Sequence, residues 1–394
     1  MKLLFVKHSL VWPRSSGHDV HTYYMMKACA ALGHEVALAT VVAPEARAID
    51  GLPLLAQVSL SAPPEPRNPG TPEPRNPPIP GTTLQRRFRS YWGVPEARIA
   101  ALRRAADDLS VDAVIAVGLD PLPYFPALST RVKRVWYAAD EWTLHHLSQV
   151  RLGSPTLAFD LKAAVLKGLY ERAHRGVVDR VWVVSERDKR AMRWVAGMAN
   201  VDVLPNGVDG TFYAPGDETP APRTAVFWGR LDFGPNIQAL EWFCRNVWPS
   251  VRRRVPDGRF TIIGFQPTEP VKALAKLDGV TLEADLPDLR PTVRRHEVVA
   301  LPFVSGAGIK NKLLEAAAMG LPIVCTPKTA TGLRGDPPIV RAESPEQFAD
   351  AVVNLWQDAD QRRRLGSTAR KWVLQNHTWE SVAREAVAGL QKTP

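Results

Sequence analysis

The sequence predicts an α/β protein made of two successive doubly wound domains. Short apolar segments alternate with helical ones, and such alternation implies a parallel sheet with helices on both faces. A polar, proline-rich stretch interrupts the alternation at residues 206–222, after which it starts again. The length of 394 residues allows each half to bury a core of its own.

The first half begins with an apolar strand at residues 3–6, followed by an irregular loop and a helix at 20–32. Gly33 suits the end of that helix because glycine readily adopts the left-handed conformation found there. The elements predicted next are a strand at 35–42, a helix at 95–109, strands at 111–117 and 132–137, a helix at 157–173, a strand at 180–184 and a helix at 186–195. We therefore expect an N-terminal domain over residues 1–205.

One segment of that domain does not fit a compact fold. Residues 63–80 are dense in proline, and residues 64–69 recur as residues 72–77. Without apolar anchors, such a segment is expected to form an extended, flexible loop. A polyproline docking site is the alternative, and a loop expansion without function is favoured over it.

The second half predicts a domain over residues 223–375, joined to the first by a linker at 206–222. Its predicted elements are a strand at 224–228, a helix at 237–254, a strand at 259–263, a helix at 271–277 and a strand at 298–301. The remainder is mostly helical in pattern. We expect a C-terminal helix within 376–394 to pack back towards the N-terminal domain.

Residues 305–324 carry the strongest indication of function. Gly306 and Gly308 belong to a loop of small residues that opens into a helix, where free backbone N–H groups can bind phosphate. Lys310 and Lys312 add positive charge at the same place. Glu315 follows one helical turn later and can accept hydrogen bonds from sugar hydroxyls. This pattern predicts a nucleotide-sugar site.

Composition excludes several classes of protein. Cys29, Cys244 and Cys325 are too few and too scattered for a disulfide framework or a zinc site, which favours a cytoplasmic protein. No apolar run reaches the length of a membrane span. The net charge of +10 indicates anionic partners, with an arginine-rich proteome as the alternative. Nucleic acid is the least favoured partner because the charge is diffuse and no recognition module is present.

A basic aromatic segment lies at residues 85–92. Arg86, Arg87, Arg89 and Trp92 could meet an anionic membrane surface or an acceptor. An ordinary solvated helix face is the alternative, and the sequence leaves both open. Membrane contact would make this a peripheral protein on the inner face of the membrane.

Several motifs together, in the right order, resemble glycosyltransferase family 4, whose members are retaining enzymes of the GT-B fold. The motifs are residues 15–17, 32–36, 183–185, 205–209, 229–232, 256–257, 262–264, 314–316 and 320–324. Pro235 and Asn236 stand where many members have Lys-Gly. The resemblance implies two Rossmann-like domains facing each other across a cleft. It also implies transfer of a sugar from a nucleotide-diphosphate donor to a hydroxyl acceptor, commonly in polysaccharide or glycolipid assembly.

The resemblance assigns donor-binding roles to matching residues. Gly17 and Gly229 fall in donor-binding turns, and Arg230 is expected to contact the diphosphate, with a surface pair to Asp232 as its alternative. Glu315 matches the glutamate that binds the nucleotide ribose. Its alternative is a helix-surface glutamate paired with Lys312.

Two positions depart from the family pattern. The first glutamate of the family's two-glutamate motif is replaced by Ala307. Either the donor site has been rebuilt with support from Lys310, or catalysis is weakened. The two lysines favour the first option. Where members often have His facing the donor sugar, this chain has Asp140 and Glu141, with His145 behind. We expect Asp140 and Lys310 to be the catalytic residues. The candidates for binding the acceptor are Asp140, Glu141 and His145.

No metal or other cofactor is expected. Asp358 and Asp360 resemble a metal-binding pair, but their position favours a helix start with an acidic first turn. Cationic side chains and a helix dipole would then stabilise the leaving diphosphate. Two further interpretations remain, a nucleotide-sugar epimerase of the same fold and, because of Ala307, a non-catalytic protein that binds sugar nucleotides.

Overall fold

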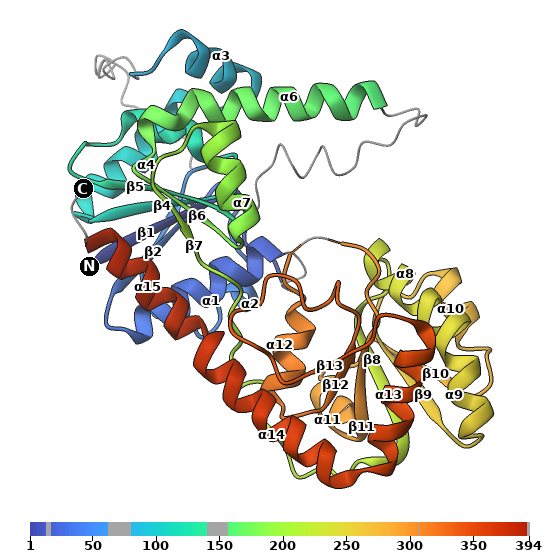
Figure 1. Cartoon of the computed structure of the whole chain (residues 1–394). Helices are drawn as coiled ribbons and strands as arrows, with labels where there is room; N and C mark the ends of the chain where they lie inside the picture. Colours follow the sequence, from blue (N-terminus) through green and yellow to red (C-terminus); the bar gives the residue numbers. More distant parts are fainter. Residues whose placement is uncertain (13–16, 62–79, 140–156, 307, 392–394) are drawn as a thin grey trace. The chain divides into compact units, whose positions relative to one another are not determined.

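A computed structural model of the chain describes residues 1–12, 17–61, 80–139, 157–306 and 308–391. The chain divides into two compact units (Figure 1). The first contains Met1–Leu204 and the chain from Val382 onward, and the second contains Pro205–Ser381. The proline-rich segment predicted at 63–80 lies, except for Pro80, outside the described residues.

The first unit is built around a parallel sheet in the order β3-β2-β1-β4-β5-β6-β7. Its strands are β1 (Lys2–Lys7), β2 (Glu35–Thr40), β3 (Leu54–Ser59), β4 (Ala113–Val117), β5 (Lys133–Ala139), β6 (Arg180–Val183) and β7 (Val201–Val203). Its helices are α1 (Gly17–Ala31), α2 (Ala46–Ile49), α3 (Thr83–Tyr91), α4 (Glu96–Asp108), α6 (Leu157–His174) and α7 (Glu186–Ala191). Shorter helical turns are η1 (Leu122–Ala127), η2 (Arg175–Val177) and η3 (Met192–Ala196).

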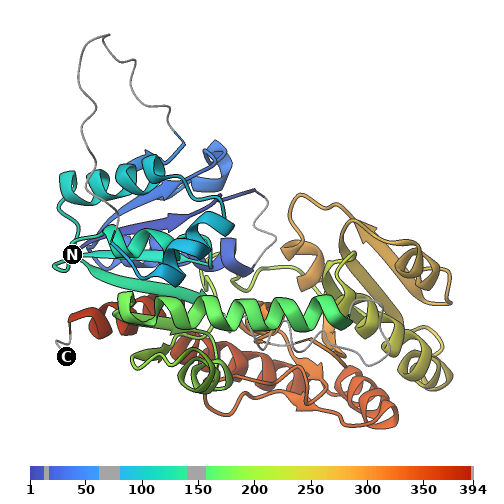
Figure 2. The same cartoon turned by 90° about the horizontal axis from the view of Figure 1, so that it is seen from above.

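The central strands of this sheet are buried on both faces, which is why they read as continuous apolar runs. The edge strand β3 alternates between half-buried and exposed residues, so its signal in the sequence is weak. Helix α3 begins with a capping box formed by Thr82 and Gln85. It packs on the long helix α6, where the rings of Phe88 and Tyr170 lie 5.1 Å apart (Figure 2, α6 in green).

The second unit contains a parallel sheet in the order β10-β9-β8-β11-β12-β13. Its strands are β8 (Ala221–Arg230), β9 (Arg259–Phe265), β10 (Val280–Ala284), β11 (His296–Leu301), β12 (Ile323–Cys325) and β13 (Val340–Arg341). Its helices are α8 (Gly234–Trp242), η4 (Phe243–Val247), α9 (Trp248–Arg254), α10 (Glu269–Leu274), α11 (Arg290–Arg294), α12 (Asn311–Ala318), α13 (Pro345–Gln357) and α14 (Ala359–Asn376). The last helix, α15 (Trp379–Gln391), begins in this unit and ends in the first.

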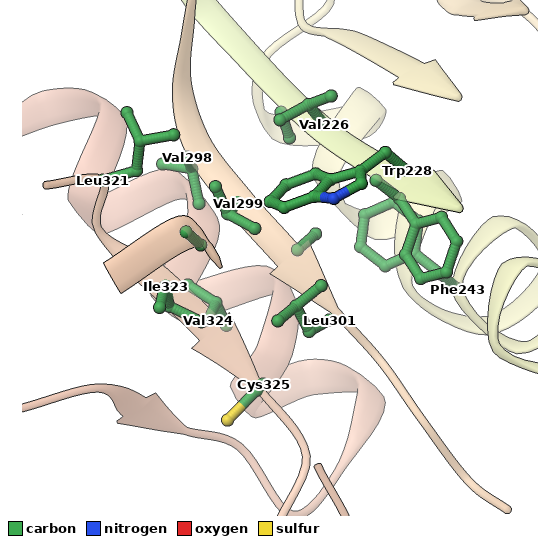
Figure 3. Close-up of a cluster of buried hydrophobic side chains, with 14 of the residues drawn as sticks. Val226, Trp228, Phe243, Val298, Val299, Leu301, Leu321, Ile323, Val324 and Cys325 are labelled. Carbon is green, nitrogen blue, oxygen red and sulfur yellow. The ribbon is translucent and has the colours of Figure 1, made fainter. Parts of the chain in front are cut away.

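The core of the second unit is formed where β8 and β11 meet their helices. Figure 3 shows Val226 and Trp228 of β8 beside Val299 and Leu301 of β11, with Phe243 from the helical side. All five side chains are at most 2% exposed. This packing fixes the ends of both strands, from which the functional loops depart.

The prediction of two parallel α/β units is confirmed, and the differences concern individual elements. The predicted helix at 237–254 begins earlier, at Gly234, and contains a π-helical turn. The edge strands β3, β10 and β13 and the short β7 were not predicted, because short or half-exposed elements carry little apolar pattern. The helix α3 was considered only as one of two alternatives for residues 85–92. Among the described helices, none is long and apolar enough to cross a membrane.

Candidate active site

The candidate site lies at the carboxyl edge of the second sheet, where the strand order reverses between β8 and β11. In open parallel sheets this reversal is the usual position of a ligand, because the connections on its two sides leave in opposite directions. Strand β8 ends at Arg230, and β11 ends at Leu301, ahead of the loop that leads to α12. Predicted donor residues from both connections therefore meet at this edge.

The loop before α12 has the predicted character. Gly306 and Gly308 have φ angles of 89° and 71°, in the left-handed region that side chains with a Cβ rarely adopt. Helix α12 begins at Asn311, as the loop-to-helix pattern predicts, and is closed by Gly320 with φ 71°. The first turn of α12 thus follows a tight backbone loop, which is the arrangement that presents N–H groups to an anion.

Lys312 is the best-positioned cation of the site. Its Nζ donates to Oδ1 of Asn236 at 3.1 Å and lies 5.0 Å from the ring centre of Phe303. Burial lowers the pKa of Lys312 to about 8, the nearby Glu315 raises it, and Lys310 lowers it. A lysine that loses water around its charge in this way gains strongly from an incoming anion.

Asn236, which we did not identify from the sequence as a site residue, organises this corner. Its Nδ2 donates to the carbonyl of Arg230 at 2.7 Å while its Oδ1 accepts from Lys312. A Cβ at Gly229 would lie 3.0 Å from Asn236 Nδ2 and from Lys312 Nζ, and its φ of 148° is one that other residues rarely adopt, so a glycine is favoured there. The Pro235-Asn236 departure from Lys-Gly was the available signal, and its role depends on contacts distant in sequence.

Glu315 faces the same edge but is not the surface partner of Lys312 that the alternative describes. Its Oε2 accepts a 2.8 Å hydrogen bond from Nε1 of the buried Trp228. The Tyr213 side chain hydrogen-bonds to it as well. Burial raises the pKa of Glu315, against the lowering effect of the Trp228 hydrogen bond and of Lys312.

Arg230 makes the contact with Asp232 that its alternative describes. Its Nε and Nη2 donate to the two carboxylate oxygens of Asp232 at 3.0 and 2.6 Å. The Arg230 side chain is 43% exposed, so this is a solvent-screened pair at the edge of the site. To bind a diphosphate through its fork, Arg230 must share or leave Asp232.

The Pro205–Asp209 motif contributes to this site through Asn206. Its Nδ2 donates to Oδ1 of Asn311, the first residue of α12, at 2.5 Å. The ring of His377 bonds to the Asn206 carbonyl at 3.1 Å. Gly207 is needed beside it because a Cβ there would lie 2.7 Å from the backbone nitrogen of Trp379. Through Asn206, the motif therefore helps to hold the first residue of α12 in position.

Other predicted residues lie apart from this cluster or cannot be placed. Gly17 is the first residue of α1 in the first unit. Asp140, Glu141 and His145 lie outside the described residues, as does Ala307. Strand β5 ends at Ala139, immediately before the predicted acceptor candidates.

The interpretation of the Asp358-Asp360 pair as a helix start is confirmed. Asp358 caps α14 by accepting from the backbone nitrogen of Gln361 at 2.8 Å, and Asp360 lies in the first turn. The side chain of Asp360 is paired with Arg363. Both carboxylates thus have structural roles in a surface helix.

Comparison with known protein families identifies the chain. Residues 15–212 match the model described as Glycosyltransferase Family 4, and residues 222–358 match the one described as Glycosyl transferases group 1. The chain belongs to glycosyltransferase family 4. The predicted resemblance is therefore confirmed, and the two matches divide the chain near the boundary between its two units.

A curated relative of this family 4 chain shares limited sequence identity with it. A GDP-mannose-dependent α-(1-6)-phosphatidylinositol monomannoside mannosyltransferase of Mycobacterium tuberculosis is 28% identical over 215 residues, covering 47% of this chain. The match spans 54% of that relative, so only about half the length of the curated protein is represented.

Solved structures agree in fold over nearly the whole chain. Sucrose-phosphate synthase from Thermosynechococcus elongatus has a TM-score of 0.66 at 14% identity, with 98% of this chain and 97% of that chain covered. HepE of Anabaena, solved with UDP and glucose, has a TM-score of 0.64 at 14% identity, with both chains fully covered at 100%. The predicted GT-B type of fold, with two parallel-sheet α/β domains, is confirmed.

Proposed function

We propose that this chain transfers a sugar from a nucleoside-diphosphate sugar to a hydroxyl acceptor, with retention at the anomeric carbon. The observation that carries the proposal is the position of Lys312, a desolvated cation on the first turn of α12, one turn from Glu315. A phosphate and a ribose can be bound at that spacing. HepE, which shares the fold, is described with UDP and glucose, which supports the same donor class for this chain.

Each donor residue has a separate role in this proposal. Lys310, Lys312 and the backbone of Gly306 and Gly308 bind the diphosphate, and Glu315 accepts from the ribose hydroxyls. As charge develops on the departing diphosphate, the two lysines and the N-terminus of α12 stabilise it. Lys310 also serves as the catalytic cation in place of the family glutamate missing at Ala307.

Acceptor chemistry is assigned to the first unit. Asp140, with Glu141 and His145 behind it, follows β5 and contacts acceptor or sugar hydroxyls. The departing phosphate takes the acceptor proton on the same face of the sugar, so no second carboxylate is required. This mechanism uses neither a metal nor another cofactor, because the positive charges are supplied by side chains.

Donor binding and turnover test the proposal in sequence. A thermal-shift screen of nucleoside diphosphates and their sugars should find a stabilising ligand, since a ligand at one hundred times its Kd adds about 2.7 kcal/mol. The full chain is then incubated with that donor in labelled form and a mixture of hydroxyl acceptors. Labelled glycan or glycolipid supports transfer, whereas an epimerised donor or binding without turnover contradicts it.

We also infer that the first unit associates with an anionic membrane, in a cytoplasmic setting and in polysaccharide or glycolipid assembly. Arg86 and Arg87 of α3 are exposed, and the neighbouring α6 exposes Leu161, Val165 and Leu169 at helical spacing. Arg89 instead pairs with Glu96 at 3.1 Å. Basic and apolar groups on adjacent helices favour the surface of an anionic bilayer.

Vesicle sedimentation tests this association. Changing Arg86 and Arg87 together to Gln should weaken binding to phosphatidylglycerol vesicles by about 2 kcal/mol at low salt, at roughly 1 kcal/mol per basic residue. The matched control changes Arg103 and Arg104 of α4, which are also exposed. Equal losses in the two variants would indicate diffuse attraction without a docking surface.

A further inference from the structure

A cavity of about 180 Å³ lies in the first unit, and its lining shares no residue with the candidate donor site. It is lined by Lys7, His8, Trp92, Arg98, Asp120 and Tyr124, among others. Lys7 ends β1, and Asp120 follows β4, the strand beside it. The cavity is therefore at the carboxyl edge of the first sheet, where its strand order reverses, as the donor site is in the second unit.

The lining is rich in hydrogen-bond donors whose positions are fixed. Lys7 is held by Asp19 at 2.7 Å, and the side chain of Arg98 bonds to that of the buried Tyr124. Trp92 is clamped by its neighbours, with Nζ of Lys167 4.1 Å from its ring centre and the ring of Tyr170 at 5.8 Å. A rigid set of donors of this kind favours a ligand that carries oxygen.

Two of these donors are left without a bond. Among the described residues, Trp92 Nε1 and Arg98 Nε are buried atoms with no hydrogen-bond partner. A buried donor without a partner is unusual in a folded protein, and functional sites are one of its ordinary explanations. Both atoms belong to side chains that line the cavity.

The charges of the lining define the class of ligand. Lys7 is already paired with Asp19, so Arg98 is the cation left for a negative group on the ligand, and Asp120 is the acidic group of the lining. A bare anion would be repelled by Asp120, whereas a hydroxylated ligand can donate to that carboxylate and accept from Arg98. At about 180 Å³ the cavity is smaller than the roughly 300–1,000 Å³ of pockets for drug-sized ligands, which favours one sugar or cyclitol ring over a whole nucleotide.

We propose that this cavity binds an anionic monosaccharide or cyclitol group of the acceptor, charged through a phosphate or a carboxylate. The assignment as acceptor rests on the proposed transferase function, but binding itself does not. Trp92 comes from the basic aromatic segment 85–92, whose acceptor role the sequence left open, and Arg98 follows it on α4.

Ligand-observed NMR titrations of the full chain test the proposal, with glucose 6-phosphate, glucuronate, glucose and inorganic phosphate as probes. At least one of the two charged sugars should bind tenfold or more tightly than both glucose and inorganic phosphate, and which one does so identifies the anionic group. Arg98→Ala should abolish the preference for charge, and Arg98→Lys, which keeps the charge, should restore part of it. Asp120→Asn should reduce the preference for the sugar over inorganic phosphate.

Three controls test whether binding is specific to this cavity and separate from the donor site. Arg104→Ala, on the same helix α4 and exposed, should bind the charged sugar as the wild type does. Excess UDP or GDP should not displace it, and Lys312→Met should not weaken it. Displacement by the diphosphate, unchanged affinity in both the Arg98→Ala and Asp120→Asn variants, or equal binding of all four probes would overturn the proposal. Failure of diphosphate binding with charged-sugar binding intact would overturn only the proposed donor chemistry.

Discussion

Trp228 Nε1 donates a 2.8 Å hydrogen bond to Glu315 Oε2, joining β8 to α12 across 87 residues of sequence. Trp228 is 2% exposed and belongs to the core shown in Figure 3. The core of the second unit thus orients the carboxylate of Glu315, the residue proposed to bind the ribose. Because the Glu315 side chain is already held in place, it loses little conformational freedom when the nucleotide binds, which favours affinity.

Replacing Glu315 with Gln should separate ribose binding from phosphate binding. The amide can still accept from Trp228, so the fold should be retained, but a neutral group accepts ribose hydroxyls less strongly. Calorimetry should show weaker binding of nucleoside diphosphates and unchanged binding of inorganic pyrophosphate, which has no ribose. Glu269→Gln, on the exposed first turn of α10, is the matched control. Equal losses for both ligands would show that Glu315 does not contact the ribose.

Because its pKa is lowered, Lys312 should make diphosphate binding depend on pH. Its pKa is lowered to about 8 by burial, so the free protein loses this charge as pH rises through that value. Affinity for a nucleoside diphosphate should therefore fall between pH 7 and pH 9. Lys312→Met should bind more weakly at pH 7 and lose this fall, while the exposed Lys276→Met control should keep the wild-type profile. An unchanged profile in the Lys312 variant would assign the dependence to another group.

The same lowered pKa has a consequence for stability. Between about pH 8 and 10.5 the unfolded chain holds this proton while the folded chain releases it, so this group makes stability rise with pH in that window. Below that window the charged, desolvated lysine opposes folding. Without ligand, Lys312→Met should therefore unfold at a higher temperature than wild type at pH 7. A lower unfolding temperature would mean that the Asn236 contact outweighs the cost of desolvation.

The local geometry of the candidate site could be predicted from the sequence, and its tertiary contacts could not. The glycine loop at Gly306 and Gly308 and the helix that follows it were predictable because they form a pattern of adjacent residues. Asn236 was missed because its role depends on Lys312, 76 positions away. The cavity at Arg98 was equally hidden, since three strand ends and two helices bring its lining together.

Arg230 differs from Asn236 because the sequence analysis did single it out, as a contact of the diphosphate. In the structure its guanidinium is paired with Asp232. If Arg230 serves the diphosphate, Asp232 competes with the ligand for its guanidinium, and Asp232→Asn should strengthen diphosphate binding. Arg230→Ala should weaken it by roughly 1.5–3 kcal/mol, the range for a charged hydrogen bond. Calorimetry with one nucleoside diphosphate compares both variants with wild type. If neither changes the affinity, the pair is only a surface contact.

The close approach of strands β8 and β9 depends on a glycine at position 264. Gly264 is paired with Gly229 between β9 and β8, and a Cβ at Gly264 would lie 1.8 Å from the Gly229 carbonyl oxygen. Backbone cannot yield as a side chain can, so Gly264→Ala should destabilise the second unit by about 1–3 kcal/mol, as overpacking does. Gly234→Ala is the matched control, because no atom lies within 4 Å of a Cβ there and its φ is negative.

Thermal unfolding and diphosphate titration measured together complete this test. Gly264→Ala should lower the unfolding temperature and weaken diphosphate binding, because the end of β8 positions both Arg230 and the Asn236–Lys312 contact. Gly234→Ala should leave the unfolding temperature unchanged or slightly raised, since alanine restricts the unfolded chain. If Gly264→Ala unfolds like wild type, β8 and β9 are not in the close register that places these residues.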